Sequence, residues 1–241
     1  MSPEEEFYNV LLTNIGRVTT FCIAVPVVVG FFNRKHFKAP VWAFWIFVLA
    51  TLSINLFEVA FIWAVKTYTS FWIPYLRKFE IADTNFLNIL SLLKDFSILG
   101  WAYILLFPGK IRRSIIWIST LLSIASIVDY FWITGYHQLG VVMPTINGIY
   151  VVVLPMYYLW FLFRSDSTLS IYKNPYFWFS IAQVVGHLIG LLFYNTGDKI
   201  YETDFILFVQ LSIARNLITV IRYFVFGYGF YMAKYARFVG K

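Results

Sequence analysis

Cysteine and charged residues are both scarce in this sequence. The single cysteine, Cys22, excludes an intramolecular disulfide, and no Cys/His spacing typical of a zinc site or of haem attachment occurs. No phosphate-binding loop or catalytic triad is present, and the carboxylates stand at no spacing typical of a nucleophile and its base. We therefore expect no metal, no cofactor and no enzymatic activity.

The low charge also separates this chain from soluble proteins. Only 13% of its 241 residues are charged, against roughly 25% in an average soluble domain. Hydrophobic residues make up 60%, and the mean hydropathy is +0.72. The apolar residues fall into seven runs, each long enough to cross about 30 Å of hydrocarbon. The runs are Asn9–Phe32, Val41–Tyr68, Phe86–Phe107, Ile115–Thr134, Leu139–Phe163, Pro175–Tyr194 and Phe205–Met232. The sequence predicts an all-α polytopic membrane protein with seven transmembrane helices in one domain, residues 1–241.

Basic residues gather in alternate loops of the chain. They follow the first, third, fifth and seventh runs: Arg34, Lys35, Lys38, Lys110, Arg112, Arg113, Arg164, Lys173, Lys234, Arg237 and Lys241. One acid, Asp166, lies among them, whereas the other loops carry an excess of acids that begins with Glu4–Glu6. The positive-inside rule then predicts that the amino terminus is outside and the carboxyl terminus is cytoplasmic. Because the cations follow topology and form no single patch, we expect a lipid bilayer and no nucleic acid as partner.

Polar side chains interrupt the predicted spans. Arg215 lies ten residues after Phe205, so at ~1.5 Å per residue it would be about 15 Å deep, near the middle of a bilayer. Counting along the other spans places their polar groups at a similar level, in the outer half of the bundle. The predicted site residues are Arg215, Asn216, Glu58, Lys94, Asp95, Asp129, His187, Asn147, Arg17 and Gln210.

These residues have two interpretations. The three cations and three carboxylates of the set can balance one another, and an unpaired charge at the bilayer centre costs about 2.5 to 3.5 kcal/mol. A purely structural network of ion pairs that specifies helix packing would therefore explain them. The functional interpretation is a water-containing pocket that opens outward, since the ionisable groups outnumber what helix register requires. In that pocket His187 would be a pH-sensitive contact.

The sequence also predicts where the side chains of Lys94 and Arg222 point. Adjacent helical residues point about 100° apart, so Lys94 and Asp95 should face different surroundings, one the pocket and the other a neighbouring helix. Arg222 lies near enough to the cytoplasmic interface for its side chain to snorkel there.

Prolines and one long loop predict irregular features. Pro26, Pro144 and Pro155 lie inside predicted spans, where each removes a backbone hydrogen bond and can kink its helix. The longest outer loop, residues 69–85, is aromatic and mixed in charge, and is expected to form an interfacial helix or a lid.

Three motifs in the last third of the chain are similar to those of a known group of proteins. Asn174-Pro175-Tyr176-Phe177-Trp178 opens the sixth run, Leu192-Phe193-Tyr194-Asn195-Thr196-Gly197 closes it, and Ala214-Arg215-Asn216-Leu217-Ile218 lies in the seventh. In these motifs the chain resembles small uncharacterised bacterial seven-helix proteins related to the membrane domains of sensor histidine kinases. The resemblance implies a multi-pass sensor or accessory protein of the bacterial inner membrane that signals through a separate membrane or cytoplasmic partner.

The sequence therefore favours a receptor-like protein that senses a small ligand, an ion or the state of the outer membrane side. Arg215 would be the central cation, with Glu58, Asp95 or Asp129 as its countercharge. Two alternatives stay open. A small transporter or an ion or proton channel would need polar groups in the inner half as well, where Arg222 and Thr219 are the main ones. A structural subunit of a larger membrane complex would instead pack its aromatic surface against protein.

Overall fold

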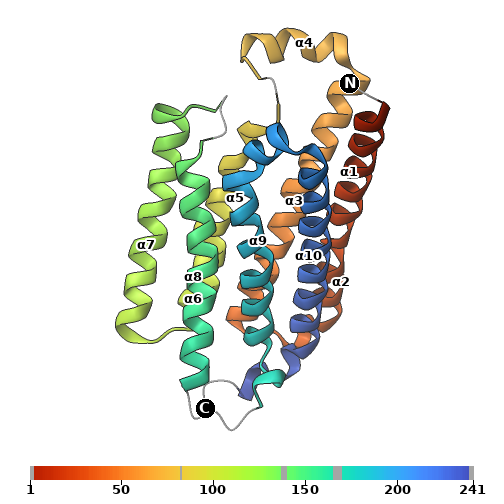
Figure 1. Cartoon of the computed structure of the whole chain (residues 1–241). Helices are drawn as coiled ribbons and strands as arrows, with labels where there is room; N and C mark the ends of the chain where they lie inside the picture. Colours follow the sequence, from red (N-terminus) through yellow and green to blue (C-terminus); the bar gives the residue numbers. More distant parts are fainter. Residues whose placement is uncertain (1–2, 82, 137–139, 165–169, 239–241) are drawn as a thin grey trace.

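The computed structural model describes residues 3–81, 83–136, 140–164 and 170–238, and every regular element in these ranges is helical. The long helices run side by side as a bundle (Figure 1). Within the described residues, six helical segments are long and apolar enough to cross a membrane, which is consistent with a multi-pass membrane protein. They are Val10–His36, Ala39–Thr67, Asn85–Ile104, Gly109–Ile133, Val142–Arg164 and Phe205–Ala236.

The second, fifth, sixth and seventh apolar runs of the sequence form long helices. They are α3 (Ala39–Thr67), α8 (Val142–Arg164), α9 (Pro175–Thr203) and α10 (Phe205–Tyr231). The sixth predicted run lies within α9, which is 29 residues long, packs against both α8 and α10, and is not among the six candidate spans. The start of α9 is fixed by Asn174, whose side chain accepts a hydrogen bond from the Tyr176 N–H at 2.9 Å. Asp204 caps α10 in the same way through the Leu207 N–H.

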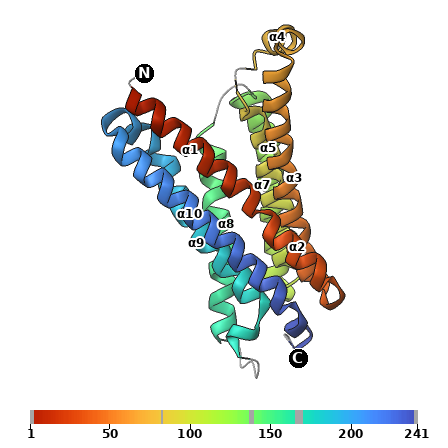
Figure 2. The same cartoon turned by 90° about the vertical axis from the view of Figure 1, so that its right-hand side faces the viewer.

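The first run forms two helices, α1 (Pro3–Cys22) and α2 (Ala24–Asn33). Pro26 has no N–H to bond the Cys22 carbonyl, and its ring crowds that carbonyl, so α1 ends at Cys22. The predicted interruption at Pro26 is therefore confirmed. Figure 2 shows α1 and α2 crossing the bundle diagonally, and both contact α10. Pro155 lies inside α8, whereas Pro144 lies in its first turn, so the predicted kink at Pro144 is wrong.

The third and fourth runs contain π-helical segments. The third is divided into η2 (Asn85–Leu87), α5 (Asn88–Leu93), η3 (Lys94–Leu99) and α6 (Gly100–Ile104); the fourth into α7 (Gly109–Val128) and η4 (Asp129–Ile133). Both η3 and η4 are π-helical, a rare geometry that is frequent at functional sites. Asp95 lies at the beginning of η3, and Asp129 begins η4.

The two ends of the bundle differ. At the lower end in Figure 1 lie η1 (Arg34–His36), the start of α7, η5 (Ile171–Lys173) and η6 (Met232–Phe238), and we call this the basic end. At the opposite end α4 (Thr69–Lys78) lies across the top of the bundle. The predicted helix in the loop of residues 69–85 is thus confirmed, while its place at a membrane interface stays a prediction.

Near the basic end the core is aromatic. Six rings from four helices are at most 1% exposed and form what we call the aromatic layer: Phe44, Phe47, Tyr103, Phe179, Phe226 and Phe230. The Phe179 ring is central, with its centroid 4.6 Å from that of Phe44 and 4.7 Å from that of Phe230. Gly229 makes this packing possible, because a Cβ there would lie 2.5 Å from the Phe179 ring.

The Gly229→Ala substitution should therefore destabilise the bundle. We expect it to lower the free energy of unfolding by about 1–3 kcal/mol, the usual cost of overpacking a core. The measurement is thermal or denaturant unfolding of the detergent-solubilised protein. Gly190→Ala is the matched control in α9, since its Cβ would meet nothing within 4 Å. A loss of stability in both variants alike would contradict a specific fit between Gly229 and Phe179.

Candidate functional site

Polar side chains from five elements meet near the middle of the bundle. We call this group the central polar cluster; it comprises Thr51 of α3, Lys94 and Asp95 of η3, Asn147 of α8, Gln183 and His187 of α9, and Arg222 of α10. Four of its members, Lys94, Asp95, Asn147 and His187, belong to the site predicted from the sequence.

Lys94 and Asp95 form an ion pair at one side of the cluster. Lys94 Nζ lies 3.0 Å from Asp95 Oδ1 and donates a hydrogen bond to Thr51 Oγ1 at 3.2 Å. Asn147 Nδ2 donates to Asp95 Oδ2 at 2.8 Å. Both charged side chains are largely buried, with exposed fractions of 10% and 5%. As predicted, the two neighbours contact different helices, Lys94 α3 and Asp95 α8, but the long lysine side chain also folds back to the adjacent carboxylate, which the prediction did not include.

Arg222 forms the other side of the cluster. Its Nη2 donates a hydrogen bond of 2.7 Å to Oε1 of Gln183, a fully buried residue of α9. Gly186, one turn further along α9, has no side chain, and a Cβ there would overlap the Arg222 side chain. The guanidinium group therefore lies against α9 inside the bundle, and its Nε is buried. The prediction that Arg222 snorkels to the interface is wrong.

The charges of the cluster are not balanced among the described residues. Lys94 and Arg222 supply two positive charges, and Asp95 supplies one negative charge. Asp95 and Arg222 interact electrostatically, and both Lys94 and Arg222 act on the imidazole of His187. A further positive charge on His187 would enlarge this excess, and an anion bound nearby would reduce it.

Several polar atoms of the cluster have unused hydrogen-bonding capacity. Within the described part of the chain, five buried side-chain atoms lack a hydrogen-bond partner, and all belong to this cluster: Asp95 Oδ1, Asn147 Oδ1, Gln183 Nε2, His187 Nε2 and Arg222 Nε. Asp95 Oδ1 has the ion pair with Lys94, but that contact lacks hydrogen-bond geometry. Buried polar groups are nearly always bonded to protein or water. The cluster can therefore accept water or a small polar molecule that offers both donors and acceptors.

The aromatic layer lies directly beside the cluster, towards the basic end. Lys94 Nζ is 4.7 Å from the centre of the Phe47 ring, and the Arg222 guanidinium carbon is 5.9 Å from that of Phe226. Along α9 the order is the same, since Phe179 is nearer than Gln183 to the basic end. The charged groups of Lys94 and Arg222 thus lie close to buried aromatic rings, and cation–π attraction stabilises them there.

Two predicted carboxylates lie outside the cluster, nearer the opposite end. Glu58 Oε1 accepts a hydrogen bond of 2.7 Å from the Thr84 hydroxyl. Asp129 Oδ1 accepts one of 2.9 Å from the Thr134 hydroxyl, within the turn that follows η4. The structure therefore divides the predicted carboxylates between different levels of the bundle.

The other predicted residues lie on α1 and α10, which contact each other. Asn216 of α10 accepts a hydrogen bond of 3.3 Å from Thr19 of α1. Arg17 and Gln210 are exposed at the surface of the described chain. Arg215 is partly exposed and lies seven residues before Arg222, about 10 Å along α10 towards the opposite end.

Gln183 is a member of the cluster that we did not predict. A signal was present in the sequence, because Ser180, Gln183 and His187 follow one another at helical spacing with Gly186 between them. These positions form a polar and small-residue face on an otherwise apolar helix. Such a face within a predicted span indicates contact with a polar neighbour, here Arg222.

Comparison of the chain with protein-family profiles, with curated proteins and with solved structures finds no match. The resemblance to membrane domains of sensor kinases thus stays a prediction. Among the described residues, no three His, Cys, Asp or Glu side chains are grouped so that they could hold a metal ion.

Replacing Gln183 tests the importance of the buried arginine contact. Gln183→Leu keeps the volume but leaves the Arg222 charge without its acceptor, which should lower the free energy of unfolding by about 3 kcal/mol. Gln210→Leu is the control, because Gln210 is exposed and should lose no stability. Unfolding of both variants in the same detergent gives the comparison. Equal stability of Gln183→Leu and the wild type would mean that Arg222 does not depend on this hydrogen bond.

Proposed function

We propose that this chain is a receptor-like integral membrane protein that responds to a proton, an ion or a small ligand and signals through a separate protein. In this proposal α9 is also a span, the sixth of seven in chain order; the basic end faces the cytoplasm of a bacterial inner membrane, and the amino terminus is outside. The alternation of basic and acidic loops supports this orientation. The position of α9 between α8 and α10 supports its assignment as a span.

The observation that carries the proposal is the incompletely bonded charged cluster in the middle of the bundle. Ionisable groups at this depth are costly, and they persist where they pair or serve a function. A purely structural network would be expected to complete its hydrogen bonds, whereas this one leaves five buried atoms without a hydrogen bond, and only Asp95 Oδ1 among them has an ion pair instead. We infer that the cluster has two arrangements, in which Asp95 associates mainly with Lys94 or mainly with Arg222.

Helix α10 connects the central polar cluster directly with the basic end. Arg222 lies on α10, which continues without a break to Tyr231 and is followed by η6. One turn after Arg222, Phe226 enters the aromatic layer, and Gly229 supports the Phe179 ring there. Movement of the Arg222 side chain would therefore disturb the packing of α10 against α9 and displace η6. A cytoplasmic partner that binds η6 would respond to this displacement.

The alternative, a transporter or an ion or proton channel, uses the same ionisable residues as a relay. A continuous path would have to pass the aromatic layer, whose six rings are at most 1% exposed. That dry layer favours the receptor over the channel. The exposed apolar surface of the bundle is equally expected for a receptor and for a subunit of a larger complex.

The test follows the response of η6 to the cluster. In a Cys22→Ser background, Tyr235→Cys in η6 carries an environment-sensitive fluorophore, and the protein in lipid nanodiscs is taken stepwise from about pH 8 to pH 4, a range that extends below that in which an isolated histidine titrates. We expect a reversible fluorescence change that is lost in Asp95→Asn and in Arg222→Gln. Arg215→Gln is the matched control on α10 and should keep the change, because Arg222 and not Arg215 makes the hydrogen bond to Gln183.

Proteoliposomes that contain a pH-sensitive dye separate the receptor from the transporter. The receptor predicts no proton flux above that of empty vesicles. Flux that disappears in Asp95→Asn would support the transporter instead. If Arg215→Gln abolishes the fluorescence change and Arg222→Gln keeps it, the site is centred on Arg215, as the sequence alone suggested.

The orientation has its own test. Lys78→Cys at the end of α4 and Lys35→Cys in η1 are both exposed positions in the Cys22→Ser background. A membrane-impermeant thiol reagent should label the Lys78→Cys variant in intact cells. The Lys35→Cys variant should be labelled only after the membrane is permeabilised. The reverse pattern would show that the basic end is outside.

A further inference from the structure

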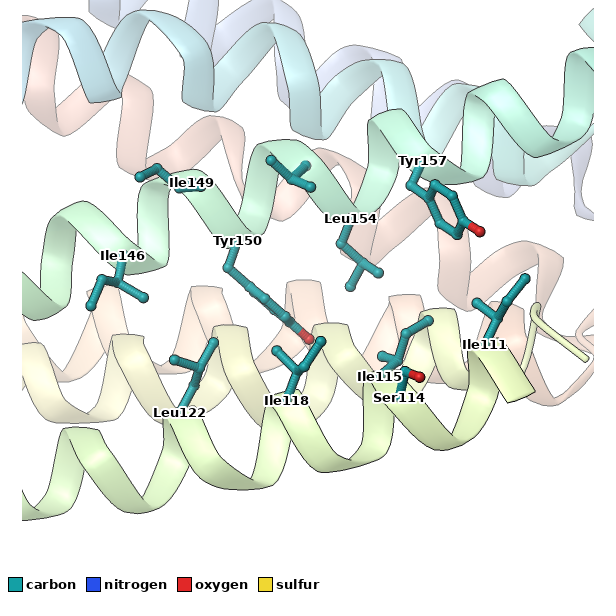
Figure 3. A pocket seen from close by; sticks show the side chains of 11 residues that line it. Ile111, Ser114, Ile115, Ile118, Leu122, Ile146, Ile149, Tyr150, Leu154 and Tyr157 are labelled. Atoms are coloured by element: carbon teal, nitrogen blue, oxygen red, sulfur yellow. The ribbon is translucent and has the colours of Figure 1, made fainter. Parts of the chain in front are cut away.

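A long apolar groove lies between α7 and α8. Its volume is about 460 Å³, and Figure 3 shows side chains from both helices facing each other across it. Ile111, Ile118 and Leu122 line it from α7, and Ile146 and Tyr157 from α8. No charged residue is among its lining residues.

The length of the groove matches one leaflet of a bilayer. From Ile111 to Leu122, and likewise from Ile146 to Tyr157, each helix advances eleven residues, or about 16 Å. Half of a typical hydrocarbon core is about 15 Å. The groove therefore extends from the basic end to about the depth of the bilayer centre.

The floor of the groove limits what can enter. Tyr150 of α8 reaches across to α7, and its hydroxyl lies 2.7 Å from the Ser119 hydroxyl in a hydrogen bond. A transmembrane helix of another chain is about 10 Å wide with its side chains, so it would not fit between two helices that approach this closely. A single flexible hydrocarbon chain would fit.

Three cations lie at the end of the groove that is nearer the basic end. Lys110 and Arg112 flank Ile111 at the start of α7 and are exposed, and Arg164 ends α8. The Arg164 guanidinium carbon lies 4.3 Å from the Trp160 ring centre, and the Trp160 ring stacks on Tyr157 at 5.6 Å. Cations with interfacial aromatic rings are the usual surroundings of anionic lipid headgroups.

We propose that this groove binds an anionic phospholipid from the leaflet at the basic end. One acyl chain occupies the groove, and the headgroup phosphate lies near Lys110 and Arg164. This site goes beyond the receptor function and depends only on the part of that proposal which inserts the bundle in a membrane.

The test is native mass spectrometry of the delipidated full-length protein after addition of phosphatidylglycerol or of phosphatidylcholine with the same acyl chains. The wild type should retain one phosphatidylglycerol in preference to phosphatidylcholine. The double variant Lys110→Gln/Arg164→Gln should lose this preference, by about fivefold for each cation removed. Arg113→Gln removes a cation from the opposite face of α7 and should keep the preference.

A second pair of variants tests the groove itself. Ile118→Trp fills it and should abolish retention of either lipid, whereas Ile116→Trp, on another face of α7 and similarly exposed, should not. Comparable thermal unfolding of the two variants excludes misfolding as the cause. Equal retention of both lipids by the wild type, or full retention by Ile118→Trp, would overturn the proposal. So would a dimer that Ile118→Trp alone dissociates, because a second copy would then be the occupant.

Discussion

Burial of the Arg222 guanidinium group is the constraint on which the arrangement of the carboxyl-terminal helices depends. A guanidinium group cannot give up its proton inside a protein, so its surroundings must supply acceptors and opposite charge. Gln183 supplies an acceptor, Gly186 leaves the space, and Asp95 supplies the charge. These requirements fix both the distance and the register between α9 and α10. A shift by one residue along either helix would place an apolar side chain where the arginine needs an acceptor.

The aromatic layer gives the charged cluster its physical properties. Rings that exclude water keep the effective dielectric constant low, so each charge in the cluster acts strongly on the others. Removal or addition of one charge is then a larger perturbation than it would be at a surface. The same rings are packed tightly enough that a displaced side chain must move its neighbours, as the fit of Phe179 on Gly229 shows. Strong coupling and tight packing together are what a switch requires.

The fold was largely predictable from the sequence, whereas the composition of the site was not. Apolar run length predicted the long helices, and the chemistry of Pro26 predicted the end of α1, because both effects are local. Depth along each span could also be counted. Counting says nothing, however, about the direction in which a residue points around its helix. That direction separates Gln183, which meets Arg222, from Gln210, which is exposed. The Lys94–Asp95 pair was missed for a similar reason, since rules for adjacent helical residues ignore the reach of a long side chain.

Tyr150 connects the central polar cluster with the groove between α7 and α8. Its ring forms part of the groove floor and packs against Phe96, the residue after Asp95, at a centroid distance of 5.2 Å. Its hydroxyl bonds Ser119 and interacts electrostatically with Asp95. A hydrocarbon chain in the groove would hold this ring in place, and its departure would free the ring to move. The position of Asp95 between its two cations would then depend on the lipid as well as on the proton or ligand at the cluster. A receptor built in this way would respond to the membrane through the same carboxylate.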